Sequence, residues 1–176
     1  MRGNEKARFL VQSAMVAAIY TVLTYLASMM NLAYGTVQFR FSEALTILPV
    51  LTPAAIPGLT LGCFLSNLAS PLGPVDWVFG SLATLLAAVC SYGTRNMKVK
   101  GLPVVSAVFP VLFNAVIIGL ENVWLASGEG EAAWAAFLPI AVSVGGGELV
   151  VCFALGLPLY YAIEKSGASK KIFQIT

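Results

Sequence analysis

The sequence predicts an all-α integral membrane protein. Three observations lead to this prediction: 59% of the 176 residues are hydrophobic, only 10% are charged, and the apolar runs are long enough for membrane-crossing helices. Soluble domains carry about 25% charged residues, so this chain has too few charges to cover a surface in water. At roughly 20 residues for each span, the chain can form five or six helices within a single domain, residues 1–176.

The first predicted elements are one full-length span and two shorter apolar helices. An apolar run over residues 9–30 is long enough to cross the membrane, and a loop over 31–39 follows it. The next apolar run is short, and three prolines lie within it or soon after it, at positions 49, 53 and 57. Proline lacks an amide donor and disfavours helix in the residue before it. We therefore expect a short or broken second helix over 44–51, a turn near Pro53 and a third helix over 56–68.

The rest of the chain predicts three longer helices. They are separated by a basic loop at 94–101 and an acidic loop at 127–131, and a proline-rich turn at 70–74 precedes the first of them. Their expected ranges, set by the apolar runs between these loops, are 74–92, 102–125 and 135–163, and either Pro74 or Asp76 opens the first of them.

The basic residues predict how such a chain lies in the membrane. Nine of the ten fall into three clusters, at the N-terminal end (Arg2, Lys6, Arg8), in the middle loop (Arg95, Lys98, Lys100) and at the C-terminal end (Lys165, Lys170, Lys171). Six crossings put all three clusters on one side, which the positive-inside rule makes cytoplasmic. Five crossings would place one terminal cluster outside. We therefore expect six transmembrane helices with both termini in the cytoplasm.

Several classes of function lack support in the sequence. There is no histidine, and the three cysteines lie inside apolar runs without the spacing of metal ligands. Phosphate-binding loops, nucleophile elbows and zinc-protease motifs are absent from the sequence, and no basic face with interleaved aromatic residues indicates nucleic-acid binding. We expect a protein that is not an enzyme and that has no metal or cofactor.

Polar side chains in or next to the apolar runs are the candidates for a binding site. A charge at bilayer depth costs roughly 2.5–3.5 kcal/mol on insertion scales and usually marks a ligand or ion path. The candidates are Arg40, Glu43, Asp76, Glu121 and Glu148, with the amides Asn67, Asn114 and Asn122. Asn114 and Glu121 are two helical turns apart and should share one helix face. Glu148 follows three glycines, which permit close approach of another backbone or a flat ligand.

Each candidate also has a purely structural interpretation. Glu148 could be a structural carboxylate paired with an amide or hydroxyl, and Asp76 could cap the fourth helix. Arg40 and Glu43 lie one turn apart, so they either form an interfacial salt bridge or act as a gate or ligand contact. These alternatives stay open at the level of sequence.

Two weaker patterns concern tryptophans and small residues. The three tryptophans fall near predicted outer helix ends, where an aromatic belt is common, although a flat heterocycle could stack on one of them; they are Trp77, Trp124 and Trp134. Ala14 and Ala18 are four residues apart on the first helix, a spacing that allows close helix packing in lipid. Because alanine is common in membrane spans, packing within the bundle is enough to explain this pair.

The segment Val37–Leu45, which reads VQFRFSEAL and is followed by Leu48-Pro49, resembles the QueT family. This family comprises substrate-binding S components of energy-coupling factor (ECF) transporters. The six-helix plan, the alanine pair on the first helix and the proline-rich second and third helices are also similar to S components in general. The resemblance implies capture of a queuosine precursor from outside, either 7-aminomethyl-7-deazaguanine or queuine. It further implies that a membrane T subunit and two ATPase subunits supply the energy for uptake.

The resemblance also implies roles for individual residues. Ala14 and Ala18 would dock on the T subunit, and the loop over 31–39, which contains Tyr34, would act as a lid. From their place between this loop and the second helix, we expect Arg40 and Glu43 to hold the hinge of the lid. A deazaguanine presents adjacent N–H donors that a carboxylate accepts in bidentate fashion, and an aminomethyl group adds a cation. The expected substrate contacts are Glu148, Glu121, Asn114, Asn122, Asn67, Asp76, Trp77 and Phe39, with the two glutamates reading the base.

Two alternatives remain at this stage. The first keeps the fold and changes the ligand to another small, flat heterocyclic vitamin. The second is a structural or assembly membrane protein whose buried polar groups only pack helices.

Overall fold

The structure, a computed structural model, describes residues 3–33, 38–125 and 130–173, and the regular structure in these residues is helical apart from one bridge between Val99 and Leu102. The elements in chain order are α1 (Gly3–Met29), η1 (Phe41–Val50), α2 (Ala55–Asn67), α3 (Pro74–Gly93), α4 (Val104–Leu125), α5 (Glu131–Val151), η3 (Cys152–Gly156), α6 (Leu157–Lys165) and η4 (Ser169–Phe173). The prediction of an all-helical membrane protein is confirmed.

Four of the described helices are long and apolar enough to cross a membrane. They are Gly3–Met29, Pro74–Gly93, Val104–Leu125 and Trp134–Lys165. The last of these joins α5 and α6 through η3, a single π-helical turn that ends just before Pro158. A π turn absorbs the local irregularity that proline imposes on helix hydrogen bonding. The two shorter apolar helices are η1 and α2, so six crossings remain a prediction.

The element η1 lies at the centre of the bundle. It is a 3-10 helix, and every residue from Ser42 to Pro49 is buried. It contacts each of the six α-helices and η3. The proline at position 49 led us to expect a short or broken helix here, and a ten-residue 3-10 segment is that irregular form. Because long 3-10 runs are uncommon, we attribute this one to the packing around it.

The helices α1 and α2 pack with their backbones close together. A Cβ atom at Gly58 would lie 2.7 Å from the Ser13 carbonyl oxygen, and one at Gly62 would lie 2.8 Å from the Tyr20 Cβ. Hydroxyls cross the same contact, since Ser13 Oγ donates to the Ala54 carbonyl at 2.9 Å. This is the small-x-x-x-small packing that membrane helices use, and it involves glycines of α2 that the sequence analysis did not single out.

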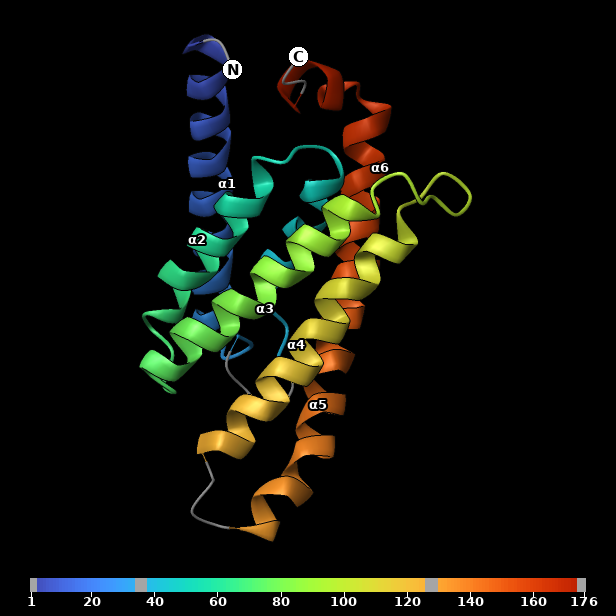
Figure 1. Cartoon of the computed structure of the whole chain (residues 1–176). Helices are drawn as coiled ribbons and strands as arrows, with labels where there is room; N and C mark the ends of the chain where they lie inside the picture. Colours follow the sequence, from blue (N-terminus) through green and yellow to red (C-terminus); the bar gives the residue numbers. More distant parts are fainter. Residues whose placement is uncertain (1–2, 34–37, 126–129, 174–176) are drawn as a thin grey trace.

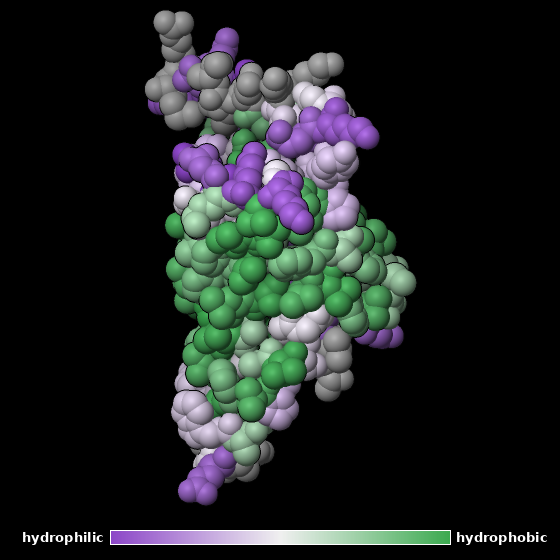
Figure 2. All heavy atoms as spheres, turned by 90° about the vertical axis from the view of Figure 1, so that its right-hand side faces the viewer, coloured by the Kyte–Doolittle hydropathy of each residue, from purple (hydrophilic) through white to green (hydrophobic). Residues whose placement is uncertain are grey.

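Figure 1 shows that the beginning of α1 and the C-terminal segment lie at the same end of the molecule. The connection between α3 and α4 lies toward that end, whereas α4 ends and α5 begins at the opposite end. Figure 2 shows a broad hydrophobic belt between two more hydrophilic ends. A belt of this kind is what a helical protein embedded in lipid should present.

We predict that Gly62→Ala loosens the contact between α1 and α2. The added Cβ would meet Tyr20 at 2.8 Å and the Ala17 carbonyl oxygen at 2.9 Å. Overpacking of this kind costs about 1–3 kcal/mol, so the thermal unfolding midpoint in detergent should fall by several degrees, at about 2–4 °C for each kcal/mol. Gly93→Ala is the matched control, since a Cβ there meets nothing within 4 Å. Equal midpoints for the two variants would contradict this account of the packing.

Candidate binding site

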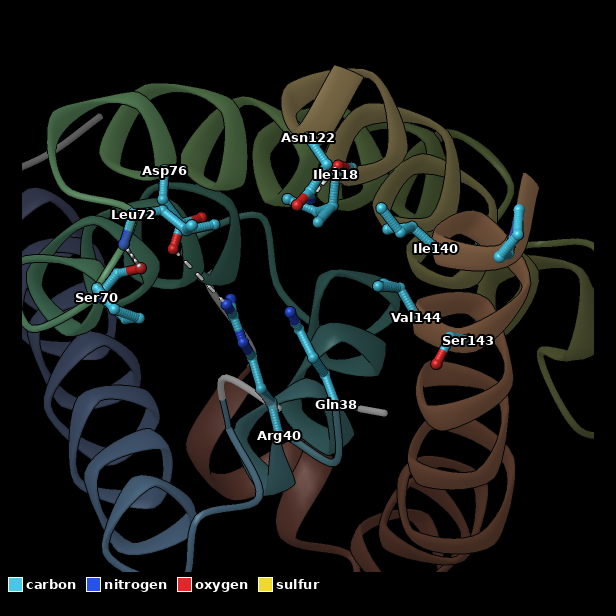
Figure 3. Close-up of a pocket in the computed structure, with 12 residues that line it drawn as sticks. Gln38, Arg40, Ser70, Leu72, Asp76, Ile118, Asn122, Ile140, Ser143 and Val144 are labelled. Carbon is cyan, nitrogen blue, oxygen red and sulfur yellow. Dashed lines mark hydrogen bonds and ion pairs between the residues drawn. The ribbon is translucent and has the colours of Figure 1, made fainter. Parts of the chain in front are cut away.

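A cavity of about 500 Å³ lies between α3, α4, α5 and the segment that leads into η1. Figure 3 shows polar side chains on several sides of it and apolar side chains from α4 and α5 between them. The polar residues that line the cavity are Gln38, Arg40, Ser70, Asp76, Asn122 and Ser143. The start of α3, the end of α4 and the first half of α5 form its walls, so it lies in the half of the molecule away from the chain termini.

Arg40 holds three separate segments together at the cavity. Its Nε donates to the carbonyl oxygen of Ala33 at 3.1 Å, and its terminal nitrogens lie 3.4 Å from Asn67 Oδ1 and 3.9 Å from Asp76 Oδ2. The side chain is only 5% exposed. In Figure 3, Arg40 and Gln38 extend side by side into the cavity from the same segment. Within the part of the chain that the structure describes, the ion pair of Arg40 is with Asp76, whereas Glu43 accepts a hydrogen bond from Tyr20.

Asn67 orients the carboxylate that pairs with Arg40. The Asn67 Nδ2 donates to the Asp76 carbonyl oxygen at 3.0 Å and to Asp76 Oδ1 at 3.4 Å. A side chain at Gly80 would run into the Asn67 amide, so glycine leaves the room for this contact. Asp76 lies in the first turn of α3, but the N-cap is Gly73 and no side chain caps the helix. Asp76 is therefore not the N-cap of α3 and makes no capping hydrogen bond, although its carboxylate does lie in the first turn, where negative charge is favoured.

A second group of buried polar residues lies deeper in the bundle. The Tyr20 hydroxyl donates to Glu43 Oε1, and Cys152 Sγ lies 3.8 Å from the Glu43 carbonyl oxygen and 3.9 Å from Glu148 Oε2. Glu43 and Glu148 are 1% and 2% exposed. Glu148 follows the cavity-lining Val144 by one turn of α5 and is not itself among the lining residues.

The helix α4 presents one polar face to the interior, as the spacing of Asn114 and Glu121 predicted. Both residues are buried. Neither carboxylate oxygen of Glu121 has a hydrogen-bond partner among the described residues, and the same holds for Asn114 Nδ2. Asn122 lines the cavity and donates to the Ile118 carbonyl oxygen at 2.8 Å. Because a buried carboxylate without donors is unfavourable, Glu121 is the side chain with the most unused hydrogen-bonding capacity near the cavity.

The aromatic candidates do not line the cavity. Trp77 lies edge-on to Phe64 with 6.4 Å between ring centroids, and its Nε1 is buried without a partner among the described residues. Phe39 is half-buried beside the lining residues Gln38 and Arg40. Trp124 and Trp134 are 58% and 64% exposed at the end of α4 and the start of α5, as residues of an aromatic belt would be.

The alanine pair on α1 faces outward. Ala14 and Ala18 are exposed, together with several large apolar side chains of the same helix. They therefore do not mediate packing within the described bundle, and docking on another subunit stays a prediction. Tyr34, the expected lid residue, lies outside the described residues.

Three polar lining residues were missed by the sequence analysis, namely Gln38, Ser70 and Ser143. Gln38 lies inside the segment that carries the family resemblance, whereas nothing distinguishes the two serines in the sequence. The position of Gln38 depends on Gly147, because a Cβ atom there would collide with the Gln38 carbonyl oxygen. The close backbone approach expected at the glycine triplet is thus confirmed at Gly147.

Similarity to a known protein family extends over most of the chain. The model of the QueT transporter family matches residues 10–165. The protein named "Queuosine precursor transporter QueT" of Lactococcus lactis subsp. cremoris (strain MG1363) is 38% identical over 83 residues, which cover 47% of this chain and 48% of that protein. The matched part therefore spans about half the length of this relative. No solved structure matches this chain.

We predict that Gly147→Ala displaces the segment that carries Gln38 and Arg40. Its Cβ would meet backbone atoms, which cannot move aside as a flexible side chain can, and overpacking costs about 1–3 kcal/mol. The thermal unfolding midpoint should fall by several degrees. The neighbouring Gly146→Ala is the matched control because a Cβ there meets nothing within 4 Å. If both variants unfold at the wild-type temperature, Gly147 does not position this segment.

Proposed function

The chain belongs to the QueT transporter family, and from this membership we propose that it is the substrate-binding S component of an ECF transporter. Its ligand is a queuosine precursor, 7-aminomethyl-7-deazaguanine or queuine, captured from outside the cell. The observation that carries this proposal is the cavity of about 500 Å³ in the membrane-embedded bundle, lined by Arg40, Asp76 and polar amides. Ligand sites of roughly 300–1,000 Å³ suit small molecules of this size.

The chemistry of the cavity supports a deazaguanine as ligand. The ring edge of the base offers adjacent N–H donors, and a carboxylate accepts two such donors at once. Glu121 is not itself a lining residue, but it adjoins the lining residue Asn122 and both of its carboxylate oxygens lack a partner among the described residues, so it suits this role. The amides of Asn122 and Gln38 line the cavity and are suited to the ring carbonyl. The aminomethyl cation would compete with Arg40 for Asp76, which lies 3.9 Å from the guanidinium.

The other expected contacts take supporting roles in this proposal. Asn67 orients both Arg40 and Asp76, and Asn114 lies two turns below Glu121 on the same buried face of α4. Glu148 lies one turn beyond the cavity wall, so it would meet the ligand only at the deep end of the site. Trp77 and Phe39 each adjoin a lining residue in the sequence, and one of them would stack on the base.

The contacts of the segment before η1 are those expected of a hinge. Arg40 fastens it to α2 and α3, and Glu43 fastens the first turn of η1 to α1 through Tyr20. A loop over 31–39 that closes the cavity would therefore turn about a fixed point at Arg40 and Glu43. Ligand binding would change the partners of Arg40 and thereby couple occupancy of the cavity to the position of the loop.

The proposed topology has six crossings with both termini in the cytoplasm. Figure 1 supports this topology, because the two termini and the α3–α4 connection lie toward the same end of the molecule. These three regions carry the basic clusters. The positive-inside rule places such an end in the cytoplasm. The cavity lies in the other half of the molecule, so it would face the outside, where an S component meets its substrate.

The proposed partners are a membrane T subunit and two ATPase subunits. The support is the outward face of α1, where Ala14 and Ala18 lie among exposed apolar residues that include Leu10, Met15 and Val22. Small residues on a membrane-embedded face let a second helix approach closely. The chain contains no phosphate-binding loop, so ATP hydrolysis has to come from other subunits.

We predict that the purified protein binds 7-aminomethyl-7-deazaguanine and that Glu121→Gln weakens this binding by about tenfold or more, because two charge-assisted hydrogen bonds lose their acceptor. Isothermal titration in detergent measures both affinities. Glu131→Gln is the control, since Glu131 is an exposed residue at the start of α5. An unchanged affinity in Glu121→Gln would remove this residue from the site, and a wild-type protein that binds no deazaguanine would refute the proposed ligand.

We predict that Ala14→Leu with Ala18→Leu abolishes association with the T subunit and leaves ligand affinity unchanged. Both side chains are exposed, so the larger residues do not disturb the bundle but do prevent close helix contact. Co-purification of the T and ATPase subunits with the tagged chain measures association. Val22→Leu, a conservative change on the same exposed helix, should retain the complex. A double variant that retains it as well would show that docking uses another surface.

A further inference from the structure

A second groove, of about 520 Å³, lies between the α3–α4 connection and the helical segment formed by η3 and α6. It shares no residue with the candidate binding site. Its walls are mainly apolar, with Leu102 on one side and Phe153, Leu157 and Pro158 on the other. Lys100, Gly101 and Tyr161 complete the lining. An apolar groove with a cation among its lining residues has the character of a site for an amphipathic ligand.

Two further lysines lie close to this groove. Lys98 Nζ is 5.4 Å from the centroid of the Tyr160 ring, and Lys165 Nζ is 5.7 Å from that of the Tyr161 ring. A hydrogen bond to Tyr160 raises the pKa of Lys98, which keeps the ammonium group protonated. Glu164 is the acidic residue whose charge acts on Lys98. Among the side chains that the structure describes here, three cations face one carboxylate, so the surroundings of the groove are positively charged.

The backbone of the loop fixes the position of Lys100. Val99 and Leu102 exchange two backbone hydrogen bonds, of 2.8 and 3.0 Å, around a two-residue turn. Both turn residues have positive φ, 51° at Lys100 and 83° at Gly101. Glycine adopts this conformation readily, whereas a residue with a long side chain adopts it rarely. The turn therefore holds a cation at the groove in a backbone conformation that a lysine does not favour by itself.

The same loop exposes apolar side chains between its lysines. Met97 and Val99 are 55% and 52% exposed and alternate with Lys98 and Lys100, and Tyr161 across the groove is 56% exposed. Figure 2 looks onto this side of the molecule and shows hydrophilic residues gathered above the hydrophobic belt. Apolar and basic side chains that alternate at such a boundary are suited to the headgroup region of a bilayer.

We propose that this groove binds one anionic phospholipid, with an acyl chain along Phe153, Leu157 and Pro158 and the phosphate at Lys98, Lys100 and Lys165. Basic pockets between membrane helices bind anionic headgroups through charge complementarity, and here the lysines are combined with an apolar groove at the edge of the hydrophobic belt. The inference does not rest on the identity of the transported substrate, because the two sites share no residue.

Native mass spectrometry of the purified chain with equal amounts of phosphatidylglycerol and phosphatidylcholine tests the proposal. The wild type should retain phosphatidylglycerol in clear preference. The triple variant Lys98→Gln, Lys100→Gln and Lys165→Gln should reduce that preference by roughly tenfold or more, since each lysine near anionic headgroups contributes several-fold to binding. The corresponding triple change to arginine should keep the preference. Lys6→Gln, an exposed lysine of α1 outside the groove, is the matched control.

Crosslinking with a photoreactive phosphatidylglycerol gives a second readout, the position of the bound lipid on the chain. It should label the peptide that contains residues 153–161 in the wild type and lose that labelling in the triple glutamine variant. Equal retention of both lipids, or labelling that the variant leaves unchanged, would overturn the proposal. If the triple variant instead loses co-purifying protein subunits while the wild type shows no lipid preference, the groove is a protein interface and the lipid site is wrong.

Discussion

A buried arginine in an apolar bundle is the constraint on which the cavity depends. An unpaired charge removed from water is strongly destabilising, so a buried ion has to be surrounded by partners with good geometry. Arg40 meets this requirement with the Ala33 carbonyl, the Asn67 amide and the Asp76 carboxylate. These partners come from the chain after α1, from the end of α2 and from the start of α3. One side chain therefore fixes the relative positions of the segments that form one half of the cavity.

The other half of the cavity depends on two glycines, Gly147 and Gly156, whose lack of a side chain permits close backbone packing. At Gly147 the backbone of Gln38 lies where a Cβ atom would otherwise be, and at Gly156 the Ala44 carbonyl oxygen lies 3.3 Å from such a position. Two glycines of the α5–η3 segment thus let η1 and the segment before it lie against this long helix. Glu43 and Glu148 come close together in this arrangement, since Cys152 Sγ contacts the backbone carbonyl of Glu43 and the carboxylate of Glu148. Because Gly147 has no side chain, the segment that carries Gln38 and Arg40 can lie at the cavity.

The fold could be predicted from the sequence more fully than the site. Helix ranges follow from the lengths of apolar runs, and Pro49 marked the irregular second helix, because both are local properties of the chain. Pairing of charges is not local. Sequence spacing allowed Glu43 as one possible partner of Arg40, yet the ion pair is with Asp76, whose carboxylate Asn67 holds in place. Ser70 and Ser143 carry no local signal at all, and only the packing of three helices brings them to one cavity.

The charge distribution links the orientation of the chain to both of its cavities. The basic clusters belong to the end that holds the two termini and the α3–α4 connection, and the groove beside Lys100 lies there. The polar cavity with Asp76 lies in the opposite half. Anionic lipids attract basic segments on the cytoplasmic leaflet, and the positive-inside rule acts on the same residues. In the proposed orientation the lysines would meet anionic headgroups and the polar cavity would face the outside, so a single asymmetry of charge would set the place of both sites.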